Sequence, residues 1–136
     1  MKDIKIIHRF ERAVVQLLNF DGWDLEWTGH STAHCDAIGF TPKNISCCIE
    51  IKFRQKYYEK KLLEKYKYDR LMEMDQEVAL YFVNDPVGNY MFWLNDIEMP
   101  ELKDMFCPST TMWNEEKVLK PCYLLNEHDA HIINKS

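Results

Sequence analysis

Two acidic residues and a lysine are spaced so that they could share one small volume. Glu50 and Lys52 lie two residues apart in the segment Cys48-Ile49-Glu50-Ile51-Lys52, and Asp36 precedes Glu50 by 14 residues. Side chains alternate between the two faces of a β-strand. Ile49 and Ile51 would therefore enter a core, while Glu50 and Lys52 share the opposite face. If Asp36 begins the preceding strand of a hairpin, it meets Glu50 and Lys52.

This combination of side chains favours metal-assisted chemistry. Two neighbouring carboxylates repel each other, and one of them tends to take up a proton unless a cation lies between them. Carboxylate oxygens are ligands that suit Mg²⁺ or Mn²⁺. A bound metal can activate a water and stabilise charge on a phosphate, while a nearby lysine steadies the attacking or developing anion. Asp36, Glu50 and Lys52 are thus candidates for a hydrolytic site.

The remaining pattern indicates the elements that must position these residues. Strands are expected at 36–41 and 45–53, joined by a turn at Pro42-Lys43-Asn44. The other expected elements are a helix at 5–19, a strand at 23–28, a long basic helix at 55–74, a hairpin of strands at 78–84 and 89–94, a short helix near 100–106 and a strand near 119–125. This order, αβββαββαβ, predicts one α/β domain over residues 1–136, with a mixed central β-sheet flanked by helices.

Glu11 occupies an unusual place on the first expected helix. At 100° per residue it falls about 40° from Ile7, inside the arc that Val14, Leu17 and Leu18 also occupy. Burying a lone carboxylate is costly unless a partner compensates it. Glu11 is therefore a candidate for the same site, although it could also lie at the edge of the apolar face and pair with Arg12 or Lys5.

Charge is distributed unevenly along the chain. The formal net charge is −5, yet residues 52–70 carry eight basic and three acidic side chains. A phosphate backbone responds to such a local field more than to the sum, although a basic segment can also be the solvated face of a helix. The last 66 residues are acidic, and Met105, Phe106 and Trp113 could form a contact surface for a protein partner or an ordinary solvated loop.

Composition excludes several other classes. No apolar segment approaches the roughly 18 residues that span a bilayer, and the N-terminus lacks the apolar stretch of a signal peptide. We expect a cytoplasmic or nucleoid-associated protein that is not secreted. The five cysteines are interpreted as reduced thiols. Cys47 and Cys48 would lie on opposite strand faces and cannot share a zinc ion, and His128 and His131 lack a nearby cysteine pair.

Several segments together resemble the PD-(D/E)xK nuclease superfamily, and within it the archaeal Holliday-junction resolvases. The resemblance covers about residues 7–54, with Cys35 at the position of the motif's proline. The matching segments are Phe10-Glu11-Arg12-Ala13-Val14-Val15, Gly29-His30-Ser31, Cys35-Asp36-Ala37-Ile38-Gly39 and Ile49-Glu50-Ile51-Lys52.

The resemblance implies a Mg²⁺-dependent DNA endonuclease, with Mn²⁺ able to substitute, acting on branched or structured DNA. Asp36 and Glu50 would hold the metal, with the Ile51 carbonyl as a third ligand. Lys52 would serve the nucleophilic water, and Glu11 would be a fourth residue beside the metal. Ser31 would contact a substrate phosphate, although it could equally be an ordinary loop serine.

Further expectations concern the partners. The residues expected to contact DNA phosphates are Ser31, Arg54, Lys56, Lys60, Lys61 and Lys65. A homodimer is expected because two paired cuts need two sites, with Tyr90, Phe92 and Trp93 as an interface or as part of the protein's own core. The alternatives are a nucleic-acid-binding module that does not cut and a nuclease subunit of a larger complex.

Overall fold

The computed structural model describes residues 4–29, 34–108 and 116–135. Helix α1 (Ile4–Phe20) is followed by strands β1 (Asp24–Trp27), β2 (Ala37–Phe40), β3 (Ser46–Phe53) and β4 (Lys60–Glu64). Helix α2 (Lys65–Met72) then leads to the hairpin of β5 (Val78–Asn84) and β6 (Gly88–Trp93). The last part contains η1 (Leu94–Asp96), β7 (Lys103–Pro108), β8 (Lys117–Asn126), η2 (Glu127–Asp129) and β9 (Ile132–Lys135).

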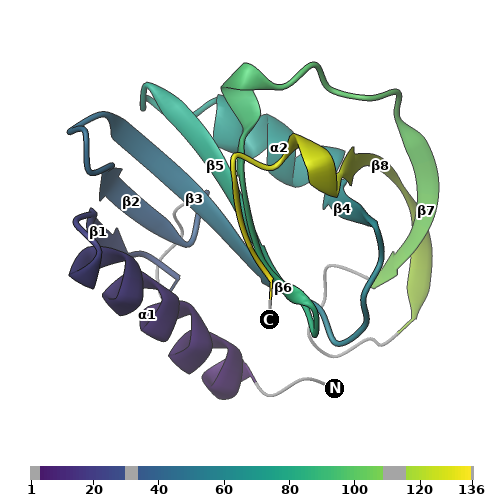
Figure 1. Cartoon of the computed structure of the whole chain (residues 1–136). Coiled ribbons are helices and arrows are strands. Elements are labelled where there is room, and N and C mark those ends of the chain that lie inside the picture. Colours follow the sequence, from purple (N-terminus) through teal and green to yellow (C-terminus); the bar gives the residue numbers. More distant parts are fainter. Residues whose placement is uncertain (1–3, 30–33, 109–115, 136) are drawn as a thin grey trace.

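A mixed six-stranded sheet forms the centre, in the order β1-β2-β3-β5-β6-β9. Its neighbouring strands are antiparallel except β3 and β5, which run parallel. Helix α1 lies on one side of this sheet, while α2 and a smaller antiparallel sheet, β4-β8-β7, lie on the other (Figure 1). The expected α/β class with a mixed central sheet is therefore what the chain adopts.

Each face of the central sheet has its own apolar core. Ile49 and Ile51 of β3 pack with Val15 of α1 and with Leu25 and Leu80. Cys48 of the same strand faces the opposite cluster, with Leu63, Leu71 and Tyr81. This alternation is the two-residue period of a strand that is buried on both faces. It leaves Glu50, between two isoleucines, on the α2 side of the sheet.

The expected basic helix over 55–74 is only partly correct. Helix α2 begins at Lys65, and residues 60–64 instead form β4, which pairs Lys60 with Asn126 and Glu64 with Cys122 of β8. Lys61 and Leu63 are buried, while Leu62 between them is half-buried. Local helical periodicity cannot predict pairing with a strand so distant in the chain, because strand formation depends on tertiary context.

At the C-terminal end, one expected element is wrong and one strand was not expected. The short helix expected near 100–106 is strand β7, which pairs Phe106 with Leu119 of β8. Strand β9, which was not expected, pairs with β6 and forms an edge of the central sheet. The strand expected near 119–125 is confirmed within the longer β8.

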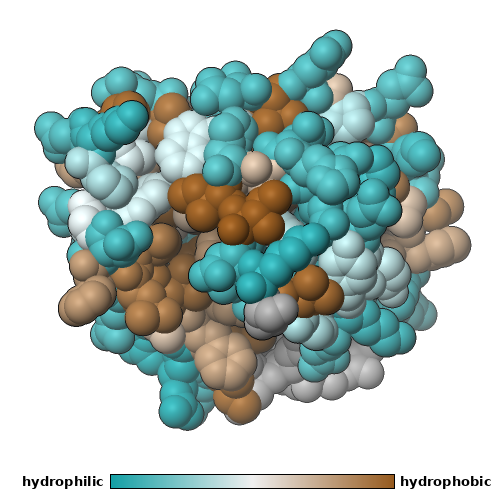
Figure 2. Space-filling view, in the orientation of Figure 1, coloured by the Kyte–Doolittle hydropathy of each residue, from teal (hydrophilic) through white to brown (hydrophobic). Residues whose placement is uncertain are grey.

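The hairpin residues expected at a dimer interface belong mainly to the protein's own core. Tyr90 and Phe92 are fully buried, and Trp93 is half-buried beside Trp23 and His131. Apolar side chains reach solvent elsewhere, as the brown surface over the α1 side in Figure 2 shows, and Phe10, Leu17 and Phe20 of α1 are exposed. Tyr90 and Phe92 are therefore not available to a twin, whereas Trp93 keeps part of its surface exposed.

No described helix is both long and apolar enough to cross a membrane. All five cysteines are buried and free.

Candidate active site

Asp36 is held at the mouth of the β2–β3 hairpin by the backbone of β3. Its own N–H donates to the Ile49 carbonyl at 2.9 Å, and its carboxylate Oδ2 accepts from the Ile51 N–H at 2.8 Å. The hairpin pairs Ala37 with Ile49, which places Asp36 opposite Glu50. The structure brings these two carboxylates together at one hollow.

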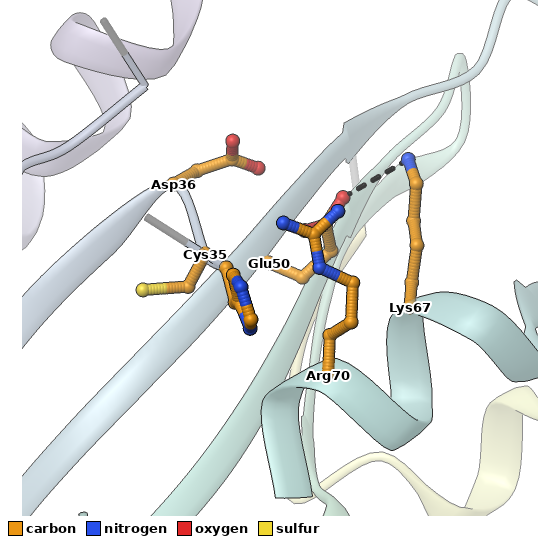
Figure 3. A pocket seen from close by; sticks show the side chains of 6 residues that line it. Cys35, Asp36, Glu50, Lys67 and Arg70 are labelled. Atoms are coloured by element: carbon orange, nitrogen blue, oxygen red, sulfur yellow. Dashed lines mark ion pairs between the residues drawn. The ribbon is translucent and has the colours of Figure 1, made fainter. Parts of the chain in front are cut away.

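Glu50 is a buried carboxylate with a cationic partner from a different element. Only 8% of the residue is exposed, and its Oε2 lies 3.2 Å from the Lys67 ammonium of α2. A hollow beside this pair is lined by His34, Cys35, Asp36, Glu50, Lys67 and Arg70 (Figure 3). Asp36 directly precedes β2 and Glu50 belongs to β3, whereas Lys67 and Arg70 come from α2.

Glu11 reaches the same region from α1. It is 6% exposed, and its Oε1 accepts a hydrogen bond from the Trp27 indole at 3.0 Å. Gly29 passes so close that a Cβ there would lie 2.7 Å from both Glu11 Oε1 and Trp27 Nε1. The lack of a side chain at Gly29 thus leaves space for the hydrogen bond between the Glu11 carboxylate and the Trp27 indole. Helical position on α1 had singled Glu11 out, and the structure buries it as expected.

Burial and neighbouring negative charges raise the pKa of two carboxyl groups in this region, Asp36 and Glu11. Burial, followed by the nearby charges of Glu50 and Glu11, raises the pKa of Asp36 to about 8, although the Ile51 N–H and Lys67 oppose the shift. Burial also raises the pKa of Glu11; the Trp27 indole and His8 oppose that shift, whereas Glu50 adds to it. Such excess negative potential is what a bound cation relieves.

The donor set fits a hard divalent cation. Asp36, Glu50 and Glu11 supply oxygens alone, which suits Mg²⁺ or Mn²⁺ better than zinc. Within the described ranges, no three His, Cys, Asp or Glu side chains are already gathered in ligand geometry. A cation held by Asp36 and Glu50 would therefore need a backbone carbonyl and waters to complete its shell, as Mg²⁺ commonly does.

The basic side chains that line the hollow come from α2, and Lys52 of β3 is not among them. Lys52 is half-buried on β3 and, by strand alternation, shares a face with Glu50, but it does not line the hollow that Lys67 and Arg70 line. Lys67 and Arg70 had been noted only as part of a basic segment. The signal that marks them is their separation of three residues, which places both on one helix face after the acidic strand.

The residues expected to contact DNA are placed very differently from one another. Lys56 and Lys60 are exposed, and Lys65 is half-exposed in an ion pair with Asp69. Arg54 is half-buried and donates to the Leu62 carbonyl at 3.1 Å. Ser31 lies outside the described residues.

Lys61 is not available to a nucleic acid. Its side chain is 3% exposed, and its ammonium lies 2.8 Å from Asp85 and 3.6 Å from Glu127. Its ammonium also lies over the Tyr57 and Tyr90 rings. The expectation that Lys61 contacts phosphate is therefore wrong, because β4 turns this residue inward to compensate two buried carboxylates.

Cys47 and Cys48 belong to the separate clusters on the two faces of the sheet, as strand alternation requires. They cannot act together as metal ligands.

Comparison with known proteins adds a fold relationship. No protein-family model matches this chain, and no curated protein matches it in sequence. Among solved structures, the chain is similar to Hjc, a Holliday junction resolvase from the archaeal hyperthermophile Archaeoglobus fulgidus, with a TM-score of 0.60 and 14% identity. The similarity covers 93% of this chain and 88% of that chain. At this identity the likeness shows a shared fold.

Proposed function

We propose that this protein is a metal-dependent DNA endonuclease that hydrolyses phosphodiester bonds, with branched or otherwise structured DNA as its substrate. The observation that carries the proposal is the convergence of Glu11, Asp36 and Glu50 beside basic side chains. The fold shared with a Holliday junction resolvase supports a nuclease-like activity.

The residues divide the work as follows. Asp36, Glu50 and the Ile51 carbonyl would hold Mg²⁺, or Mn²⁺ in its place. Glu11 would be a further carboxylate beside the metal. When bound, the cation supplies Lewis-acid stabilisation of a phosphate and of its attacking water. The Ile51 N–H fixes the Asp36 carboxylate in place, and the Trp27 indole does the same for Glu11. Lys52, from the face that holds Glu50, would steady the anion that attacks the phosphate.

DNA would be held by the basic segment that leads into α2. We retain Arg54, Lys56, Lys60 and Lys65 as phosphate contacts, together with Ser31, and leave out Lys61 because it is buried. Such contacts give affinity without sequence preference and depend strongly on salt.

A homodimer would give the paired cuts that a branched substrate requires. Its interface cannot use Tyr90 or Phe92 of β6, because both side chains are buried in the protein's own core. A protein partner on the acidic C-terminal part is a separate proposal: Phe106 is exposed there and Met105 half-buried, while Trp113 lies outside the described residues. A nuclease subunit of a larger complex would use that surface.

One observation favours a second candidate function. Lys67 already neutralises Glu50 from within the protein. An internal cation of this kind suits a nucleic-acid-binding module that keeps the fold and does not cut.

A panel of DNA substrates tests both functions. Duplex, single-stranded, flap and four-way-junction DNA are incubated with the protein in Mg²⁺, Mn²⁺ or EDTA, and the products are resolved on denaturing gels. We expect cation-dependent cuts that disappear in Asp36→Asn and Glu50→Gln. Asp24→Asn, which removes an exposed carboxylate from β1, should cut normally. Binding without any cut under every condition would favour the non-cutting module.

A further inference from the structure

The candidate site has a basic wall that the sequence motif does not include. Lys67 and Arg70 line the hollow together with Asp36 and Glu50, and Figure 3 shows both side chains reaching from α2 toward Glu50. Lys67 and Arg70 form this wall. They lie three residues apart on one helix, so both side chains extend from the same helix face.

Helix α2 holds this wall firmly. Leu71 is fully buried in the core on that side of the sheet, and Tyr68 packs against Tyr123 of β8 with ring centroids 5.0 Å apart. At the start of the helix, Glu64 pairs with Lys120 at 2.9 Å. The two basic side chains therefore project from an anchored element rather than from a loop.

Arg70 is oriented by its own helix. Its guanidinium lies 5.0 Å from the centre of the Tyr66 ring, and it donates to the Tyr66 hydroxyl. A guanidinium has five N–H donors in a planar fork that suits phosphate oxygens. The contacts with Tyr66 hold this guanidinium at the hollow that Asp36 and Glu50 also line.

Lys67 is engaged differently, because its ammonium pairs with Glu50, a proposed metal ligand, at 3.2 Å. About a third of the Lys67 side chain is exposed, whereas the Glu50 side chain is largely buried. A divalent cation beside Glu50 would compete with the ammonium for the same carboxylate. The ammonium would then turn to whatever anion lies in the hollow.

We propose that Lys67 and Arg70 form a phosphate-binding subsite, and that Lys67 is the internal counter-ion of Glu50, exchanging this carboxylate for a DNA phosphate when a divalent cation binds. The inference rests on the proposed function and adds to it a second role for α2. Under this exchange, metal binding and DNA binding favour each other. The metal takes the Glu50 carboxylate and the DNA phosphate takes the Lys67 ammonium, and these two groups are otherwise paired with each other.

Metal affinity gives the first test. Calorimetric titration with Mn²⁺ alone compares wild type with Lys67→Gln and with Lys103→Gln, which removes the same charge from exposed β7. Removing the competing ammonium should tighten Mn²⁺ binding about threefold or more, as expected for a partly exposed ion pair. Lys103→Gln should match wild type. Equal affinities for the two variants would overturn the exchange.

DNA affinity gives the second test. Fluorescence anisotropy measures binding of a four-way junction in EDTA and in Ca²⁺. In Ca²⁺, Lys67→Gln should lose about tenfold in affinity, the typical loss of one charge-assisted hydrogen bond. In EDTA its loss should be much smaller, because Lys67 is then occupied by Glu50. Losses of equal size in both buffers would show ordinary electrostatic attraction and would overturn the proposal.

Arg70→Gln separates the subsite from any folding defect of the Lys67 variant. It should weaken DNA binding in both buffers, and Arg70→Lys should restore part of the loss; no loss in Arg70→Gln would overturn the subsite. A wild-type protein that shows the metal linkage but cuts nothing would overturn the proposed function and leave the subsite supported. A wild-type protein that cuts, with both variants behaving like Lys103→Gln, would overturn the subsite alone.

Discussion

At the scale of single residues, a variant of Lys52 tests whether this lysine takes part in the cleavage step. If Lys52 steadies the attacking anion, Lys52→Ala should slow cleavage by at least about a hundredfold while DNA binding stays nearly unchanged, because the interaction is made in the transition state. Single-turnover cleavage and anisotropy measure the two quantities. Lys43→Ala, on the exposed turn of the same hairpin, is the matched control. Normal cutting by Lys52→Ala would remove this lysine from the mechanism.

Asp36 provides a prediction about pH. Its pKa is raised from 3.8 to about 8 by burial and by Glu50 and Glu11. Between these two values the folded protein keeps a proton that the unfolded chain releases. The stability that this group contributes is therefore present below about pH 4 and lost as the pH rises to 8.

Urea unfolding in EDTA measures this effect. Between pH 5 and pH 8 the wild-type free energy of unfolding should fall, with this group contributing on the order of 1 to 3 kcal/mol. Asp36→Asn should show a flatter profile, because asparagine does not titrate. Asp24→Asn, an exposed carboxylate, should follow wild type. Parallel profiles for all three proteins would show that Asp36 ionises normally.

Sequence reasoning could identify the acidic residues because their signals are local. The two-residue period of β3 placed Glu50 opposite its apolar neighbours, and the helical wheel placed Glu11 on the buried side of α1. Sequence reasoning did not place Lys67 and Arg70 at the site, because their position depends on how α2 packs. The packing of α2 is set by contacts between residues far apart in the chain, such as Tyr68 with Tyr123.

At the scale of elements, β4 shows what tertiary pairing does to a locally ambiguous segment. Lys60 and Lys61 are adjacent in this strand, and they face opposite environments: Lys60 is exposed, whereas Lys61 is buried with Asp85 and Glu127. Because this segment was expected to be helical, both lysines were predicted to contact DNA. The pairing of β4 with β8 decides which one enters the core.

This contrast gives a matched pair of variants. Lys61→Ala should lower the free energy of unfolding by about 3–5 kcal/mol, because it leaves two buried carboxylates without their cation. Lys60→Ala should change stability by less than about 0.5 kcal/mol and should weaken DNA binding instead. Urea titration and anisotropy measure the two effects. A stable Lys61→Ala variant with weakened DNA binding would restore the original surface assignment.

The expected and observed elements agree best where pairing is between chain neighbours. The β2–β3 and β5–β6 hairpins fall close to their expected positions, since short turns fix their register. Strands β4 and β9 were missed, and their partners, β8 and β6, lie far away in the chain. Strand β7 was also missed, although it pairs with the next strand, β8.

At the scale of the whole molecule, assembly decides how the proposed activity is used. One site cuts one strand, so resolving a four-way junction requires two sites related by a two-fold axis. Light scattering at micromolar concentration should give about twice the 16.4 kDa of one chain. A monomeric mass, with and without junction DNA, would leave a nuclease that cuts single strands and would remove the junction-resolving version.

The connection between the parallel strands β3 and β5 contains β4 and α2. The β2–β3 hairpin, which brings Asp36 beside Glu50, closes over a short loop, whereas α2 packs against β8 through the distant contact of Tyr68 with Tyr123. Loop closure is slower for distant contacts. During refolding, the carboxylates should therefore gather before Lys67 arrives, and dissolved cations meet Glu50 first. The order of events in folding would then be the reverse of the exchange that the mature site undergoes.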